Sequence, residues 1–185
     1  MRLFVALELS KEVHDNLRAL VTRLQRTNAD LRWVRPDGMH LTLKFIGEVP
    51  PEERAPIEEA LAGVRSPAPV RMDFRGLGYF PNERRPRVLW VGIEASENLA
   101  GLAAQVELLL EPLGIPREKR AYVPHLTLGR FKSAARLERL QQEIARGPAA
   151  EFGTVETNEL VLFQSRLSPA GADYTPLGKF SFFRP

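Results

Sequence analysis

The sequence predicts a bilobal α+β fold, in which two antiparallel sheets with outer helices surround a central cleft and a pseudo-twofold axis relates the halves. Three observations lead to this prediction. The tetrapeptide His-Leu-Thr-Leu occurs twice, at residues 40–43 and 125–128. A strand-like and then a helix-like segment precede each copy, and another amphipathic segment follows each copy. Further strands with a hairpin-like pattern come late in each half, which favours antiparallel sheets.

In the first half, residues 3–9 are predicted as a strand, and Ser10 is a suitable N-cap for the helix that follows. The apolar stripe of that helix consists of Val13, Leu17, Leu20, Val21 and Leu24. The first tetrapeptide then forms a strand that is expected to end at Phe45. A second amphipathic stretch contains Ile57, Ala60, Leu61 and Val64. Residues 70–77 alternate as a strand.

The second half repeats this order. Residues 88–94 are predicted as a strand, and Ser96 as the cap of the next helix. Its apolar stripe consists of Leu99, Leu102, Val106, Leu109 and Leu110. After the second tetrapeptide, Phe131 is expected to end the strand, and a last amphipathic stretch contains Leu137, Leu140 and Ile144. Strands are predicted at 159–164 and through Phe180 and Phe182, with an exposed loop at 81–86 and a break at Gly147-Pro148.

Length and composition limit the class of protein. With 185 residues and 44% hydrophobic content, residues 1–185 are expected to form one bilobal domain with a real core. No apolar run is long enough for a membrane span and no signal-like segment opens the chain, so we expect a cytoplasmic protein without a membrane partner. The absence of cysteine excludes disulfides and thiolate chemistry. Of 26 basic residues 21 are arginine, which favours phosphorylated ligands, although genome composition or life at high temperature would give the same excess.

Each tetrapeptide presents a histidine and a threonine on one face of a strand and two leucines on the other, because alternate residues share a face. We expect the leucines to enter the core while His40, Thr42, His125 and Thr127 face the cleft. Two imidazoles at one substrate can take and give a proton, and two hydroxyls can donate to the oxygens of a phosphoryl group. The pattern therefore predicts metal-free acid and base catalysis at a phosphodiester.

Three other interpretations are weaker. A zinc site would need a third ligand, and neither tetrapeptide has an acidic neighbour; the remaining histidine, His14, is expected to be a solvated helix residue. A serine hydrolase would need a nucleophile motif that is missing. A purely structural role for His40 and His125 is the usual reading of a lone histidine, but it does not account for the pair.

Four further side chains are candidates for the site. Arg130 would clamp the phosphate if a bulge at Gly129 turned it to the face of His125; otherwise it is a solvated residue at the strand end. Lys44 has the parity of His40 and could equally lie at the surface. Tyr79 and Phe80 could form a stacking wall for a base or belong to an aromatic core.

At these residues the chain resembles the two-histidine phosphoesterase superfamily, and within it the RNA 2′,3′-cyclic phosphodiesterases, also called 2′-5′ RNA ligases. The resemblance extends over residues 2–7, 78–82, 86–90, 124–130 and 162–167. Members of this family have a bilobal fold and act without metal or cofactor. They hydrolyse terminal 2′,3′-cyclic phosphates to 2′-phosphates, and some join RNA halves through a 2′-5′ bond without ATP.

The resemblance implies that His40 is the proton donor and His125 the proton acceptor, with Thr42, Thr127 and Arg130 on the phosphate. The residues alone do not orient the two histidines, because the halves look alike. The expected partners are RNA with 2′,3′-cyclic phosphate ends or cyclic nucleotides, bound by a monomer. The alternative function is a non-catalytic nucleotide-binding module on the same fold.

Overall fold

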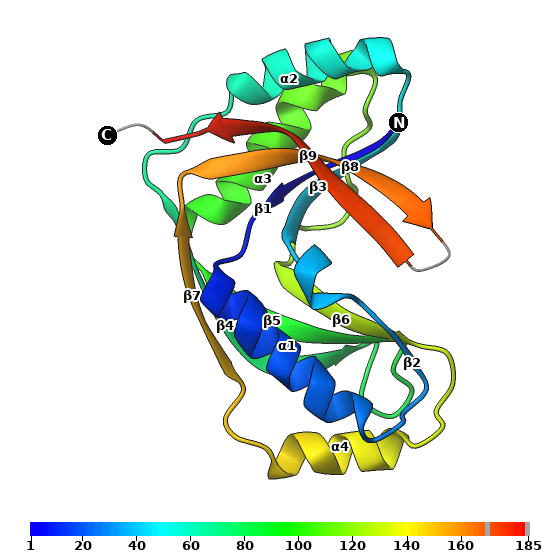
Figure 1. Cartoon of the computed structure of the whole chain (residues 1–185). Helices are drawn as coiled ribbons and strands as arrows, with labels where there is room; N and C mark the ends of the chain where they lie inside the picture. Colours follow the sequence, from blue (N-terminus) through cyan, green and yellow to red (C-terminus); the bar gives the residue numbers. More distant parts are fainter. Residues whose placement is uncertain (169–170, 184–185) are drawn as a thin grey trace.

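Two antiparallel sheets make up the centre of the computed structural model, which describes residues 1–168 and 171–183 (Figure 1). The first sheet has the strand order β3 (Leu41–Glu48), β1 (Arg2–Leu7), β8 (Glu159–Ser168) and β9 (Gly171–Ser181). The second has the order β2 (Leu31–Trp33), β6 (His125–Phe131), β5 (Val88–Ala95), β4 (Val70–Phe80) and β7 (Glu151–Thr157). These sheets confirm the predicted α+β class.

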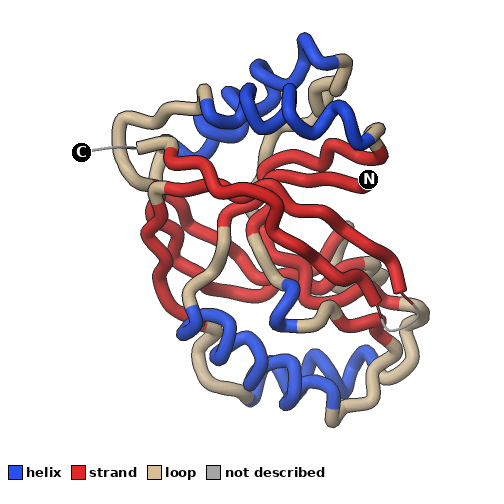
Figure 2. Tube along the Cα trace, turned by 45° about the horizontal axis from the view of Figure 1, so that its top comes forward, coloured by secondary structure: helices blue, strands red, loops and turns tan. Residues whose placement is uncertain are grey.

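Helices form the two outer layers, with the sheets between them (Figure 2). The four helices are α1 (Lys11–Gln25), α2 (Arg54–Ala62), α3 (Asn98–Leu110) and α4 (Leu137–Arg146), and short 3₁₀ turns occur at Pro36–Gly38, Pro51–Glu53 and Glu111–Leu113. Helix α1 follows β1 of the first sheet but packs against β7 and α4 in the second lobe, and α3 follows β5 of the second sheet but packs against α2 and β3 in the first lobe. Each half of the sequence therefore contributes elements to both lobes.

The amphipathic stripe of α1 is confirmed, because its five predicted residues are all buried and the Ser10 hydroxyl accepts a hydrogen bond from the Val13 amide. The prediction that Ser96 caps α3 is wrong. Glu97 is the N-cap, and the Ser96 hydroxyl instead accepts the Arg71 amide at 3.0 Å and donates to Asn98 at 2.6 Å. This serine joins the start of the helix to β4.

Two strands were not predicted, and both have local reasons. Strand β2 has only three residues, too few for an alternating pattern. In β7 the buried residues Phe152 and Val155 are three apart, because Phe152 bulges where the register with β4 shifts. Bulges change the spacing of apolar positions from the two residues of a regular strand.

Among the described residues, no helix combines the length and the apolar character that crossing a membrane requires.

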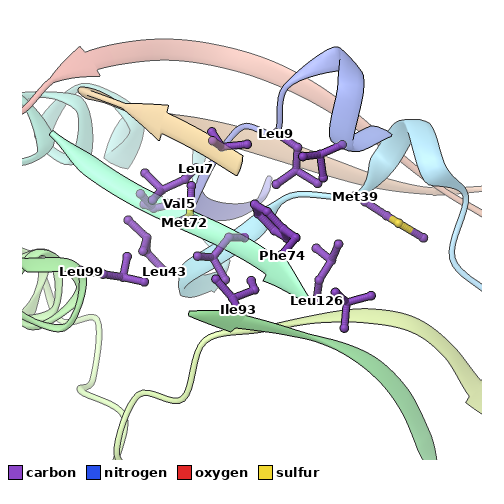
Figure 3. Close-up of a cluster of buried hydrophobic side chains, with 14 of the residues drawn as sticks. Val5, Leu7, Leu9, Met39, Leu43, Met72, Phe74, Ile93, Leu99 and Leu126 are labelled. Carbon is purple, nitrogen blue, oxygen red and sulfur yellow. The ribbon is translucent and has the colours of Figure 1, made fainter. Parts of the chain in front are cut away.

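The four leucines of the tetrapeptides enter the core, as predicted. Each is at most 4% exposed, and they belong to one buried cluster that spans both sheets. Leu43 from the first motif and Leu126 from the second belong to this cluster, and in Figure 3 they lie on either side of Ile93 and Phe74. The common core fixes the two motif strands relative to each other.

Strand β3 bulges immediately after its histidine and threonine. Val5 pairs with Lys44 and Ala6 with Thr42, so Leu43 is the extra residue. Phe131 ends β6 as predicted, but β3 continues past Phe45 to Glu48, because the bulge lets the strand keep pairing with β1. Beyond the bulge, Lys44 points into the core.

Lys44 is therefore not a surface lysine, and it does not share the face of His40, although it is among the residues that line the cavity between the two motif strands. Its side chain is 3% exposed, and Nζ donates to Glu107 Oε2 at 2.7 Å and to the Pro116 carbonyl at 2.5 Å. The same Glu107 oxygen accepts the Glu118 amide at 3.2 Å. The ion pair thus ties β3 to α3 and to the loop after it.

The Lys44→Met variant should destabilise the fold by about 3 to 5 kcal/mol, because it leaves the half-buried Glu107 carboxylate without its counter-charge. A Lys44→Met/Glu107→Leu double variant should recover most of that loss. The matched control is Lys11→Met, since the Lys11–Asp15 ion pair lies in solvent and such pairs contribute at most about 1 kcal/mol. Urea denaturation measures all three; a Lys44→Met loss no larger than that of Lys11→Met would contradict the expectation.

Candidate active site

A cavity of about 810 Å³ lies between the two motif strands. All five residues predicted for the site line it: His40, Thr42, His125, Thr127 and Arg130. The alternation of β3 and β6 sends their side chains to the cleft face while the leucines point the other way. The structure therefore brings the two halves of the predicted site together in one cavity.

His40 lies in an aromatic pocket at the start of β3. Its ring stacks on Phe4 with centroids 4.6 Å apart and on Phe163 at 5.4 Å, and it meets the edge of Tyr174 at 4.9 Å. Burial in this pocket lowers the pKa of His40 to about 4, an effect that the Gly38 backbone partly offsets. In the free protein at neutral pH the His40 ring is therefore neutral.

His14 supports the turn that precedes His40. The prediction of a solvated helix residue is wrong, because this half-buried ring on α1 donates from Nδ1 to the Pro36 carbonyl at 2.9 Å. Arg18, one turn further along α1, forms an ion pair with Asp37 of the same 3₁₀ turn. The charge of His14 also contributes to lowering the pKa of His40. Helix α1 thus helps to position the first motif.

His125 has a different environment from His40. Its ring is exposed, meets the edge of Phe80 with centroids 5.3 Å apart, and makes a hydrogen bond from Nδ1 to the Val123 carbonyl at 2.8 Å. A carbonyl only accepts, so Nδ1 carries the proton and Nε2 of the neutral ring keeps a free lone pair. The segment before His125 is anchored in turn, because the Tyr122 hydroxyl donates to the Thr42 carbonyl at 3.1 Å.

The bulge needed to turn Arg130 towards the cleft is present. Leu89 pairs with Gly129 and Trp90 with Thr127, so Leu128 is the extra residue in β6. The bulge lies one position before Gly129, the position that the sequence suggested for it. Leu128 and Gly129 are both buried, and Arg130 returns to the exposed face and lines the cavity. The bulge in β6 corresponds to the bulge at Leu43 in β3.

The two candidate aromatic residues separate. Tyr79 packs against the core, where burial raises the pKa of its hydroxyl to about 12. Phe80 lies in the cleft wall and stacks on Trp90 with centroids 5.1 Å apart. Sequence reasoning missed Phe45, which is 63% exposed and lines the cavity, because only the bulge at Leu43 turns it to that side. The exposed ring of Phe45 therefore offers an apolar face to a ligand in the cavity.

In each sheet, the residues that pair across neighbouring strands just beyond the bulge form a row. The two rows have different chemistry. In the first sheet the paired residues beyond the bulge are aromatic: Phe163, Phe4 and Phe45. In the second sheet the paired residues are Phe80, Val88, Arg130 and Arg32. One wall of the cleft is thus mainly aromatic and the other is cationic, and of these seven residues Phe45 and Arg130 line the cavity itself.

Within residues 1–168 and 171–183, no three histidine, aspartate or glutamate side chains come together as a metal site would require.

Comparison with known proteins supports the duplication and extends it to related sequences. A family model described as LigT-like phosphoesterase matches the chain twice, over residues 7–90 and 91–174. An RNA 2′,3′-cyclic phosphodiesterase of Methanothermobacter thermautotrophicus is 33% identical, and the match covers 97% of this chain and 98% of the relative. A protein of the same name from Thermus thermophilus is 41% identical, with 98% of this chain and 90% of the relative covered.

Solved structures share the architecture. A crystal structure of a Thermus thermophilus protein matches with a TM-score of 0.79 and 37% identity, covering 98% of each chain. A crystal structure of E. coli LigT in complex with 3′-AMP matches with a TM-score of 0.77 and 24% identity, covering 99% of this chain and 98% of that one. At this identity the second match shows the fold alone. Both matches include the two lobes and the cleft strands.

The burial of His40 should make the protein less stable in acid. Its pKa is about 4 in the folded protein and about 6.5 in an unfolded chain, so only the unfolded state takes up this proton between those values. Stability is lost as the pH falls from about 6.5 to about 4, by up to about 3 kcal/mol. His40→Asn should show a smaller acid-induced loss than the wild type in urea denaturation. His125→Asn is the control, because that ring is already in solvent; equal pH dependence of all three proteins would disprove the effect.

Proposed function

This chain belongs to the LigT-like phosphoesterase family and has RNA 2′,3′-cyclic phosphodiesterase activity, and we propose that His40 and His125 carry out the reaction in the cleft between the motif strands. The observation that carries the proposal is the convergence of both His-Thr pairs and Arg130 on one cavity. The substrate is an RNA end that carries a 2′,3′-cyclic phosphate, or a cyclic nucleotide.

His125 acts as the proton acceptor. The hydrogen bond from its Nδ1 to the Val123 carbonyl leaves the Nε2 lone pair available to take a proton from the attacking water. The exposed position of the ring gives water access to it. A ribose 5′-hydroxyl in place of that water would give a 2′-5′ bond, which is ligation by the same chemistry.

His40 acts as the proton donor to the departing 3′ oxygen. Since its pKa is about 4 in the free protein, only about one ring in a thousand is protonated at pH 7. A phosphodiester anion beside the ring favours the imidazolium form, because an opposite charge stabilises a cation. The substrate therefore brings about the protonation that the donor role requires, and the aromatic pocket makes the resulting imidazolium a strong acid.

Thr42, Thr127 and Arg130 stabilise the phosphoryl group. The two hydroxyls lie two residues after the histidines on the same face, where they can donate to the non-bridging oxygens as charge develops there. Arg130 adds a guanidinium fork that matches two phosphate oxygens. Phe45 presents an exposed ring on which a base can stack.

A non-catalytic nucleotide-binding module is not favoured. Relatives that share 31–41% identity over most of the chain are named as the enzyme, and both His-Thr pairs of the cleft are intact. Binding alone would not require the free Nε2 lone pair of His125.

The proposal is tested on an oligoribonucleotide that ends in a 2′,3′-cyclic phosphate. The expected product is the 2′-phosphate, identified by mass spectrometry and by its resistance to a 3′-specific phosphatase. Turnover should persist after exhaustive treatment with EDTA, because the two histidines supply the acid and the base. Loss of activity on chelation with recovery on added Zn²⁺ or Mn²⁺ would refute the mechanism, and binding without turnover would support the module instead.

The two histidines should respond differently to the leaving group. His40→Ala should lose about 10² to 10⁴ in rate on the cyclic phosphate, whose ribose oxygen needs a proton, but recover much of it on a nitrophenyl phosphodiester, whose leaving group does not. His125→Ala should be impaired on both substrates, because water still needs a base. Single-turnover rates of both variants give the answer, and the reverse pattern would exchange donor and acceptor.

A further inference from the structure

Arg32 is a cationic residue next to the site that the mechanism does not use. It lies in the middle of β2 and pairs directly with Arg130 across the β2–β6 ladder. Residues directly opposite in an antiparallel pair share a face, so both guanidinium stems leave the sheet on the cleft side, while Leu31 is buried on the other side. Arg130 lines the cavity, and Arg32 stands one strand further out.

This arrangement is unfavourable without an anion. Like charges directly opposite each other destabilise a strand pair. None of the ion pairs within residues 1–168 and 171–183 involves Arg32 or Arg130. Asp30, the nearest acidic residue in the sequence, accepts the Ser133 hydroxyl at 2.6 Å instead. The two guanidinium groups are thus available to an external anion, since no carboxylate in the described part of the chain pairs with them.

Strand β2 has no counterpart in the first sheet. The first sheet ends at its motif strand β3, whereas the second continues past its motif strand β6 to β2. The extra strand therefore extends the cationic wall outwards from Arg130 and adds Arg32 at its edge. An RNA chain whose terminal phosphate lies at Arg130 has its next phosphate one ribose away, and neighbouring strands are about 4.8 Å apart, a step that long arginine side chains can span.

We propose that Arg32 binds the phosphodiester immediately upstream of the reacting cyclic phosphate, and that it makes an oligoribonucleotide a better substrate than a cyclic mononucleotide. The inference rests on the proposed function of the cleft. It assigns Arg32 to substrate selection and not to the chemical step, since it lies outside the cavity that holds the two histidines. A guanidinium fork suits a phosphodiester, which offers two equivalent oxygens.

The test compares three substrates with the wild type and Arg32→Gln. The first is adenosine 2′,3′-cyclic phosphate; the second is a dinucleotide with the same cyclic end and an ordinary phosphodiester; the third is that dinucleotide with a neutral methylphosphonate linkage. The wild type should use the charged dinucleotide about tenfold better than the neutral one in kcat/KM, as expected for a hydrogen bond to a charged group. Arg32→Gln should lose this preference, because its kcat/KM should fall on the charged dinucleotide and stay unchanged on the other two substrates.

Two further variants keep the outcome clear. Arg32→Lys retains the charge but not the fork, so it should keep part of the preference. Arg146→Gln removes one exposed arginine from α4 on the outer layer and should match the wild type on all three substrates. The dependence of log kcat/KM on log salt for the charged dinucleotide should become shallower by about 0.7 in Arg32→Gln alone.

Arg32→Gln should also melt at the same or a higher temperature than the wild type, since it removes a like-charge pair. Equal losses on the mononucleotide and the dinucleotides would place Arg32 on the reacting phosphate and overturn the proposal, as would an unchanged preference for the charged linkage. A wild type that turns over none of the three substrates would overturn the proposed function itself. The two failures are therefore distinguishable.

Discussion

Each motif strand bulges at its second leucine, and the position of that bulge determines which side chains reach the cleft. Up to the bulge, alternation buries the leucines and turns the histidine and threonine towards the cleft. After it, the parity changes, so that Lys44 and Gly129 turn inwards while Phe45 and Arg130 turn out. Packing of the leucines stabilises the bulges, because these leucines belong to one core that spans both sheets. In a regular strand, Arg130 would have pointed away from the cavity that it now lines.

The two histidines come from identical tetrapeptides, yet their surroundings differ in the property that matters for proton transfer. His40 is enclosed by three aromatic rings, and burial lowers its pKa, whereas His125 is exposed and has its tautomer fixed by a backbone carbonyl. The rings around His40 come from β1, β8 and β9. Three strands remote in sequence from the first motif therefore give the duplicated histidines unequal environments.

The sequence was sufficient to predict the fold class, most elements and five of the residues that line the cleft. Alternation and helical spacing are local signals, and the repeat added the long-range information that two motifs face each other. The features that could not be predicted depend on contacts between elements that are distant in the sequence. The bulge in β7 removes the alternating pattern by which a strand is predicted, and the bulge in β3 turns Lys44 inwards and Phe45 outwards. Ser96 does not cap α3 because its hydroxyl bonds to the Arg71 amide of β4. His14 was misjudged for a similar reason, because its partner Pro36 is brought near only by packing.

The crossing of helices and strands between the lobes bears on the origin of the chain. The first half supplies β1 and β3 to one sheet and β2 and β4 to the other, and the second half completes both sheets. Neither half of the sequence therefore contains all the strands of a lobe. Two separate copies of one half would have to exchange strands to build both sheets, as in a domain-swapped dimer, whereas the single chain allows the residues around the two motifs to differ.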